Sequence, residues 1–205
     1  MVDDLRVRGA AAVYSAQLDV TDNDAQDAAI AEAWRVLERV DVALIAHGTL
    51  PDQRRCETSP DYALAEFNVN ATATVALLTR LAPRLLAQRQ GTLAAISSVA
   101  GDRGRASNYL YGSAKASVTT YLSGLRQRLS SEGVHVLTIK PGFVDTPMTD
   151  QLKKGALWAS PDRVATGIVR AIDRRRGVVY VPWFWAGIMF VIKHIPEFVF
   201  RRIKL

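Results

Sequence analysis

The sequence has little of several features that would assign a protein to a class at once. Its single cysteine, Cys56, cannot form an intramolecular disulfide, and it has no partner at metal-ligand spacing, so we expect no metal site. No apolar run reaches the ~18 residues that a membrane-spanning helix needs. The N-terminus also lacks the basic start and apolar stretch of a secretory signal. These absences predict a cytoplasmic protein.

The net charge of +6 is the one compositional feature that suggests a nucleic-acid partner. The basic residues, however, are spread among the predicted helices, apart from local clusters at 174–176 and 201–204. The first cluster falls at the predicted end of a helix, where cations complement the helix dipole. We therefore expect no nucleic-acid partner. With 205 residues, 49% of them hydrophobic and 22% charged, the chain suits one globular domain with a real core.

Short apolar segments alternate with segments of helical periodicity along the chain. The expected strands are 11–18, 41–46, 91–97, 134–139 and 178–181, and the expected helices are 3–9, 25–40, 67–88, 108–129 and 160–174. Pro83 is expected to bend or interrupt the third helix. This alternation predicts an α/β fold in which helices cover both faces of a parallel sheet.

The stretch from Ile96 to Lys115 carries the chemistry. A helix that begins near Asn108 places Tyr111 and Lys115 on one face, four residues apart. A lysine ammonium there would stabilise the phenolate and lower the pKa of the tyrosine toward the working range. Ser98, at the end of the preceding strand, could bind the same substrate oxygen. The pair alone usually means only a half-buried aromatic and a solvated lysine, and the further motifs give it its functional interpretation. Tyr109 is expected to pack.

Three motifs in order resemble the short-chain dehydrogenase/reductase family: Ser98, the Tyr111-x-x-x-Lys115 pair, and the PGFVDT turn at 141–146. The likeness covers about 18–182 and implies a Rossmann-like, doubly wound parallel sheet. It also implies a catalytic set of Asn70, Ser98, Tyr111 and Lys115, which would transfer hydride between NAD or NADP and a small carbonyl or alcohol substrate. The residues expected to bind the cofactor are Asp19, Gly48, Tyr111, Lys115, Pro141, Gly142, Val144 and Thr146. We also expect the protein to be a homo-oligomer.

One part of the family pattern has no counterpart. Family members open with a glycine-rich turn that cradles the cofactor pyrophosphate, but the first glycine here, Gly9, follows a predicted helix end. We therefore expect an N-terminally truncated sheet that lacks the first two family strands, with impaired cofactor binding. The alternative is a non-catalytic interaction or regulatory protein built on the same scaffold. At Ile45 to Gly48 the sequence also departs from the family's Asn-Asn-Ala-Gly; His47 would either touch cofactor or be a hydrogen-bonded loop residue.

The last segment, 183–205, differs from the single domain expected over 1–182. It is rich in aromatic and aliphatic residues and ends in basic ones, and Lys193 and Pro196 interrupt it. This composition is typical of a segment that lies on an anionic membrane surface, and it is weakly similar to relatives that act on lipid-linked substrates. A flap over the substrate pocket and a dimer contact remain the other two possibilities.

Overall fold

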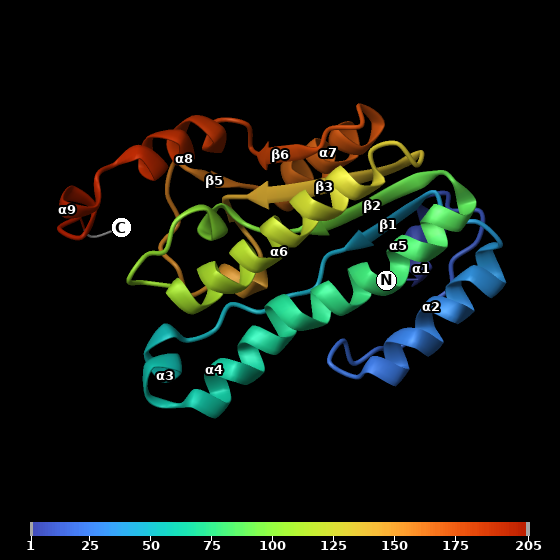
Figure 1. Cartoon of the computed structure of the whole chain (residues 1–205), viewed down its shortest axis with the longest axis horizontal. Helices are drawn as coiled ribbons and strands as arrows, with labels where there is room; N and C mark the ends of the chain where they lie inside the picture. The colour runs from blue at the N-terminus through green and yellow to red at the C-terminus, as the bar shows by residue number, and fades with distance from the viewer. Residues whose placement is uncertain (1, 204–205) are drawn as a thin grey trace.

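The computed structural model describes residues 2–203 and shows a parallel four-stranded sheet between helices (Figure 1). The strands of this sheet are β1 (Val42–Ile45), β2 (Gly91–Ile96), β3 (Val134–Pro141) and β6 (Val178–Val181), in the spatial order β1-β2-β3-β6. A second, two-stranded parallel sheet joins β4 (Phe143–Val144) to β5 (Trp158–Ala159). The expected α/β architecture with a parallel sheet is confirmed.

The helices fall close to their predicted places. They are α1 (Val2–Val7), α2 (Asn23–Leu37), α3 (Gln53–Thr58), α4 (Pro60–Phe67), α5 (Ala73–Gln88), α6 (Tyr109–Leu129), α7 (Pro161–Asp173), α8 (Trp185–His194) and α9 (Glu197–Phe200). Side chains cap several of them: Asp22 accepts from two backbone N–H groups of α2, and Ser160 accepts from one of α7. The short α3 lies between the expected strand 41–46 and the expected helix 67–88, where no helix is predicted. Helix α5 continues through Pro83, so an interruption there is wrong, and a bend stays a prediction.

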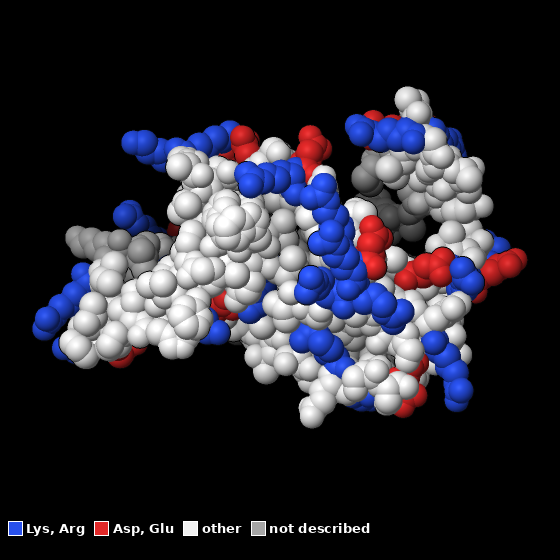
Figure 2. Space-filling view, turned by 90° about the horizontal axis from the view of Figure 1, so that it is seen from above, with Lys and Arg blue, Asp and Glu red and all other residues white. Residues whose placement is uncertain are grey.

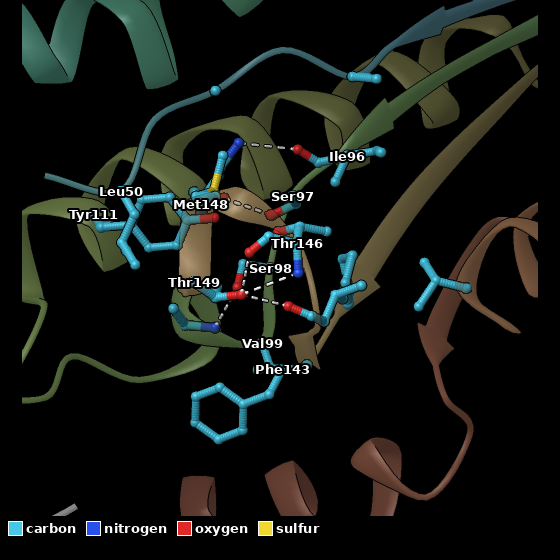
Figure 3. A pocket seen from close by; sticks show the side chains of 18 of the residues that line it. Leu50, Ile96, Ser97, Ser98, Val99, Tyr111, Phe143, Thr146, Met148 and Thr149 are labelled. Atoms are coloured by element: carbon cyan, nitrogen blue, oxygen red, sulfur yellow. Dashed lines mark hydrogen bonds between the residues drawn. The ribbon is translucent and has the colours of Figure 1, made fainter. Parts of the chain in front are cut away.

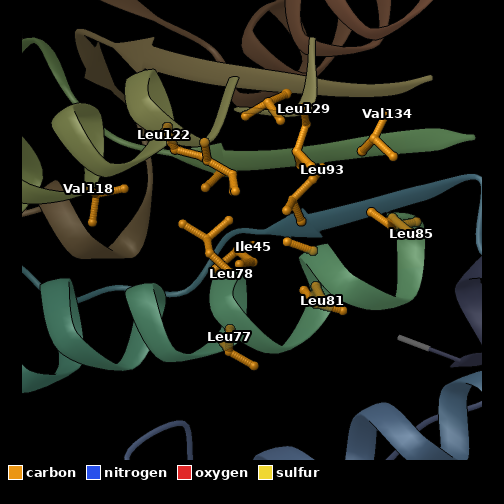
Figure 4. Packing of buried hydrophobic residues seen from close by; sticks show 14 of the residues in the cluster. Ile45, Leu77, Leu78, Leu81, Leu85, Leu93, Val118, Leu122, Leu129 and Val134 are labelled. Carbon is orange, nitrogen blue, oxygen red and sulfur yellow. The ribbon is translucent and has the colours of Figure 1, made fainter. Parts of the chain in front are cut away.

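Helices α5 and α6 cover one face of the sheet and form its larger core (Figure 4). Leu78, Leu85, Leu93 and Leu122 are fully buried there. Each such leucine contributes about 1.5–3 kcal/mol of burial free energy, so this face holds the strands in register. Helix α7 covers the other face, where Val164 and Ile168 pack on β2, β3 and β6.

The first expected strand is absent. Residues 10–20 form no strand or helix and are mostly exposed, so the prediction of a strand at 11–18 is wrong. The segment has an apolar, β-rich composition but does not pair with β1, and a strand needs such a neighbour to satisfy its backbone groups. In the described chain β1 is therefore an edge of the sheet, and Val42 and Leu44 on its second face are 42% and 44% exposed.

No helix within residues 2–203 is both long and apolar enough to cross a membrane.

Candidate active site

A cavity of ≈ 370 Å³ opens where the carboxyl ends of β1, β2 and β3 meet (Figure 3). Ligands collect at this position in open parallel sheets. Its polar wall contains Ser98, Tyr111 and Lys115, and the first half of α7 and the 146–152 segment form much of its apolar wall. Of the predicted cofactor residues, Gly48, Pro141, Gly142, Val144 and Thr146 also line it. The structure therefore gathers most of the predicted site into one cavity.

Two predicted residues lie outside the cavity lining. Asn70 is 1% exposed, and it sits on one wide turn of π-helix, Asn68–Thr72, between α4 and α5. Such turns are frequent at functional sites. Asp19 is exposed and accepts hydrogen bonds from the backbone N–H and hydroxyl of Thr21, at 2.9 and 2.7 Å, which lower its pKa. In this structure Asp19 is committed to its own turn and is not part of the cavity.

Helix α6 is fixed against the Ser98 segment by very close backbone approach. A Cβ on Gly112 would come within 2.8 Å of the Ala100 carbonyl oxygen, and a Cβ on Gly101 within 2.7 Å of the Ala116 nitrogen. Ser97 adds a hydrogen bond of 2.9 Å to the Lys115 carbonyl oxygen. These contacts require glycine at both positions and hold Tyr111 opposite Ser98. Tyr109, two residues earlier, is 45% exposed, so the expectation that it packs is wrong.

Burial raises the pKa of the Tyr111 phenol above its ordinary value, and a hydrogen bond with Ser98 offsets only part of this effect. The sequence predicts a lowered pKa for Tyr111, and that expectation is wrong. The Lys115 ammonium lies 5.6 Å from the centre of the Tyr111 ring and donates a hydrogen bond of 3.1 Å to the Ile96 carbonyl oxygen. Tyr111 is therefore held as a neutral phenol, the form that can give up a proton.

Lys115 is 3% exposed and has no carboxylate partner among the described ion pairs. Burial lowers its pKa from 10.5 to about 8. A Cβ on Gly48 would lie 3.4 Å from its Nζ atom and 3.0 Å from Oδ1 of Asn70. Gly48, Asn70 and Lys115 thus meet at one point of the cavity wall.

This burial predicts a pH-dependent stability. Between pH 8 and pH 10.5 the unfolded chain retains the Lys115 proton and the folded chain releases it, so the free energy of unfolding rises with pH through this window. Relative to Lys115→Met, wild-type protein should gain about 2–3 kcal/mol across the window. Chemical denaturation at several pH values measures the difference. Wild-type protein compared with Lys153→Met, which removes an exposed lysine and keeps Lys115, should show no such gain. A difference between wild type and Lys115→Met that stays flat or falls with pH would contradict the lowered pKa of Lys115.

A buried ion pair ties two walls of the site together. Lys140 Nζ lies 2.5 Å from Asp102 Oδ1, with the side chains 8% and 2% exposed, and the Tyr180 hydroxyl donates to Asp102 Oδ2 at 2.6 Å. Burial and, to a lesser extent, the Asp102 carboxylate raise the pKa of Tyr180. Asp102 follows the Ser98 segment, and Lys140 directly precedes Pro141. The pair therefore fixes the serine relative to the Pro-Gly turn.

Helix α8 packs against two residues of the cavity wall, Gly142 and Val99. A Cβ on Gly142 would overlap the Trp185 indole, and Trp185 and Met189 are 2% and 1% exposed against Val99. Arg103 donates to the carbonyl oxygens of Ile192 and Ile195 at 2.7 and 2.6 Å, which fixes the end of α8. The first part of the tail thus packs against the site.

His47 also lines the cavity. Its Nε2 atom lies 3.2 Å from both the Val69 carbonyl oxygen and the Thr74 hydroxyl, and burial lowers its pKa. His47 is therefore a hydrogen-bonded loop residue, one of the two possibilities raised by the sequence, and contact between its side chain and a cofactor stays a prediction. In the part of the chain that the structure describes, no cluster of three or more His, Cys, Asp or Glu side chains is placed to hold a metal ion.

Several lining residues had no signal in the sequence. They are Arg105, Asn108, Phe143, Met148 and Leu152, together with the α7 side chains Val164 and Ile168. The arginine stands in a glycine- and arginine-containing loop, which by itself indicates only solvent exposure. The α7 residues reach the cavity through packing on the second face of the sheet, which no local pattern records.

Residues 1–156 match the short chain dehydrogenase family. The chain is 37% identical over 198 residues to an uncharacterized oxidoreductase of Mycobacterium tuberculosis, covering 97% of this chain and 80% of that protein. Among solved structures, it resembles a short chain dehydrogenase/reductase from Burkholderia phymatum in complex with NAD, with a TM-score of 0.83, 21% identity and coverage of 100% and 82%. A short chain dehydrogenase from Burkholderia cenocepacia in complex with NADP gives a TM-score of 0.77 at 20% identity, with coverage of 91% and 76%.

The chain belongs to the short-chain dehydrogenase/reductase family. It is therefore an oxidoreductase with a Rossmann-like fold, as the order of its serine, tyrosine and lysine motifs had predicted.

Proposed function

We propose that the protein catalyses the NAD- or NADP-dependent interconversion of a carbonyl and an alcohol, with Ser98, Tyr111 and Lys115 as catalytic residues and Asn70 as their support. The observation that carries the proposal is the convergence of these three side chains on one cavity at the carboxyl ends of β1, β2 and β3. The family and the complexes of its structural relatives with NAD and NADP support it.

The cavity fits the nicotinamide and ribose end of such a cofactor. Gly48 leaves room beside Lys115 and Asn70 that a side chain would fill, and the Lys115 ammonium offers donors to ribose hydroxyls. Pro141, Gly142, Val144 and Thr146 line the adjoining wall and would hold the ring and its amide. When bound, the cofactor supplies the two-electron reducing or oxidising equivalent. Asp19, which would face the adenine, stays a prediction, as does weakened cofactor binding in a chain without a glycine-rich turn.

Tyr111 acts on the proton. In reduction its hydroxyl donates a hydrogen bond and then the proton to the carbonyl oxygen, and in oxidation the phenolate accepts the proton of the alcohol. Burial keeps the phenol neutral before reaction, which suits the reducing direction. Ser98 is 9% exposed beside it, and its hydroxyl orients the same oxygen and stabilises the charge that develops there.

Lys115 and Asn70 support Tyr111. The ammonium near the ring stabilises the phenolate left after proton transfer. The Asn70 amide donates to the Glu66 carbonyl oxygen at 3.0 Å and to the Thr49 hydroxyl at 2.8 Å, while its oxygen accepts from the Thr49 N–H at 3.0 Å. This network fixes the Gly48 loop, and with it the route by which a water relay would return protons to Lys115.

A lipidic or lipid-linked substrate fits the apolar surroundings of the cavity. Met148 and Leu152 at its wall are 41% and 37% exposed, and on the tail Trp183 and Phe190 are 79% and 66% exposed. Figure 2 shows a broad uncharged surface over one end of the molecule with lysines and arginines at its border. Apolar surface beside basic residues suits a membrane interface. We therefore place the protein in the cytoplasm with residues 183–205 at the membrane surface.

Co-sedimentation with anionic vesicles of phosphatidylcholine and phosphatidylserine tests this placement. The double variant Trp183→Ser/Phe190→Ser should sediment several-fold less than wild type, because both side chains are exposed and their loss leaves the packed Trp185 in place. Equal sedimentation would remove the membrane role. The tail would then act as a pocket flap or an oligomer contact.

A homo-oligomer is the expected assembly, and β1 offers a surface for it. The unpaired edge of this strand and its exposed Val42 and Leu44 are features that folded proteins usually cover. The same surface would serve the alternative function, a non-catalytic interaction protein. Light scattering together with a turnover assay separates the two.

The turnover assay follows the absorbance of NADH and NADPH in the presence of a panel of ketones, and of NAD and NADP with the matching alcohols. Wild-type protein should oxidise one reduced cofactor with at least one ketone. Gly48→Val should weaken cofactor binding by tenfold or more, because its side chain would meet Asn70 and Lys115. Cofactor binding that is equal in wild type and Gly48→Val would contradict the proposed cofactor site.

A further inference from the structure

Four buried polar side-chain atoms of the described residues have no hydrogen-bond partner; two of them belong to residues that line the cavity, and a third contacts a lining residue. Arg105 Nε and Asn108 Oδ1 belong to residues that line it. Trp185 Nε1 lies on Gly142, another lining residue. Buried polar groups are nearly always satisfied, and an unsatisfied one costs ~1–3 kcal/mol. The two unpaired atoms of Arg105 and Asn108 at the cavity lining indicate that a ligand supplies their missing partners.

Arg105 stands on the loop that leads into α6, directly before the helix that carries Tyr111. Its pKa is lowered by burial alone, and no ion pair of the described chain involves it. The neighbouring Arg103, in contrast, is fully used by the tail, where it bonds carbonyl oxygens and pairs with Glu197 at 2.9 Å. A partly buried guanidinium with no counter-ion is a receptor for an oxyanion.

Asn108 is placed just as unusually. It occupies the N-cap position of α6, yet its side chain makes no capping hydrogen bond, although such a cap stabilises a helix by about 1 kcal/mol. Gln53 from α3 supplies part of the missing cap, because its side-chain oxygen accepts a hydrogen bond from the Leu110 N–H at 3.1 Å. The side-chain amide oxygen of Asn108, Oδ1, is left buried at the cavity wall without a partner and can accept a hydrogen bond.

The charges of the cavity also favour the binding of an anion. Its basic side chains are His47, Arg105 and Lys115, and none of the described residues that line it is Asp or Glu. Lys115 already has a role beside Tyr111 in the proposed reaction. Arg105 is therefore the cation that remains for the substrate.

We propose that Arg105 binds an oxyanion substituent of the substrate, a phosphate or a carboxylate, and that Asn108 accepts a hydrogen bond from a hydroxyl next to it. The proposal rests on the proposed function, because the anion would place the neighbouring carbonyl at Tyr111 and Ser98. It makes charge on the substrate, and not only its apolar part, the determinant of specificity.

Two pairs of ketones that differ in charge test this: dihydroxyacetone phosphate against dihydroxyacetone, and pyruvate against acetone. Binding is measured by calorimetry or ligand-observed NMR, without turnover. Wild-type protein should bind the charged member of at least one pair about tenfold or more tightly. The pair that shows the preference tells phosphate from carboxylate.

Arg105→Gln should remove most of this preference, and Arg105→Lys should keep part of it, because the charge remains and the planar fork is lost. Arg128→Gln, at the far end of α6 and exposed, is the matched control and should behave as wild type. Equal binding of charged and neutral ketones by wild type would overturn the proposal. So would a preference that survives in Arg105→Gln, or an effect of that variant on NADPH affinity instead.

The outcome is separable from that of the proposed function. Selective binding of a charged ketone without any turnover would support the anion site and count against the reductase. Turnover of neutral and charged ketones with equal efficiency would support the reductase and count against the anion site.

Discussion

Replacing Tyr111 with phenylalanine is expected to lower kcat for carbonyl reduction by about 10²–10⁴-fold, the range for loss of a general acid. The ring would still fill its buried place against Ser98 and Lys115, so folding and cofactor affinity should change little. Steady-state kinetics and a cofactor titration on the same preparation measure the two effects.

Tyr109→Phe is the matched control, because this tyrosine lies one half-turn away on the same helix and is 45% exposed. It should retain wild-type kcat. A Tyr111→Phe protein that keeps its rate would show that another group gives up the proton, and one that loses cofactor binding would place the hydroxyl in the binding site instead.

The second large effect is on stability. Asp102→Ala would leave the Lys140 ammonium buried without its carboxylate, a change that costs roughly 3–5 kcal/mol in comparable buried pairs. The Tyr180 hydroxyl would lose its acceptor as well. Because small domains are stable by only about 5–15 kcal/mol, urea denaturation should show a large fall in the midpoint.

The double variant Asp102→Leu/Lys140→Met separates the buried charge from the packing. It removes both charges together, so it should be considerably more stable than Asp102→Ala. Asp150→Ala, at an exposed position, should leave the midpoint almost unchanged. If Asp102→Ala is no more destabilising than Asp150→Ala, the pair does not hold the Ser98 segment to the Pro-Gly turn.

The sequence predicted those parts of the fold whose signals are local. Helical spacing placed Tyr111 and Lys115 on one face of α6, and the helix expected at 160–174 matches α7. Apolar runs located β1, β2, β3 and β6. The segment 11–18 carried the same kind of signal but forms no strand, since a strand depends on a neighbour as well as on its own composition.

The candidate site also has a part that the sequence predicts and a part that depends on tertiary packing. The order of the motifs predicted that Ser98, Tyr111, Lys115 and the Pro-Gly turn belong to one site, and the structure brings them to one cavity. The pKa of Tyr111 was misjudged, because it depends on burial by several elements and not on Lys115 alone. Trp185 against Gly142, the buried Asp102–Lys140 pair and the free Arg105 guanidinium are all products of tertiary packing, for which a single sequence has no signal.

Transfer of label from deuterated cofactor tests the central claim most directly. Wild-type protein is incubated with NADH or NADPH deuterated at the transferable position of the nicotinamide ring, together with the charged and neutral ketones, and the alcohols formed are examined by mass spectrometry. We expect deuterium at the former carbonyl carbon with wild type and Tyr109→Phe, and almost none with Tyr111→Phe. Wild-type protein that binds cofactor and ketone but transfers no label, or Tyr111→Phe protein that transfers it at the wild-type rate, would contradict the assignment of this cavity as a Tyr111-dependent oxidoreductase site.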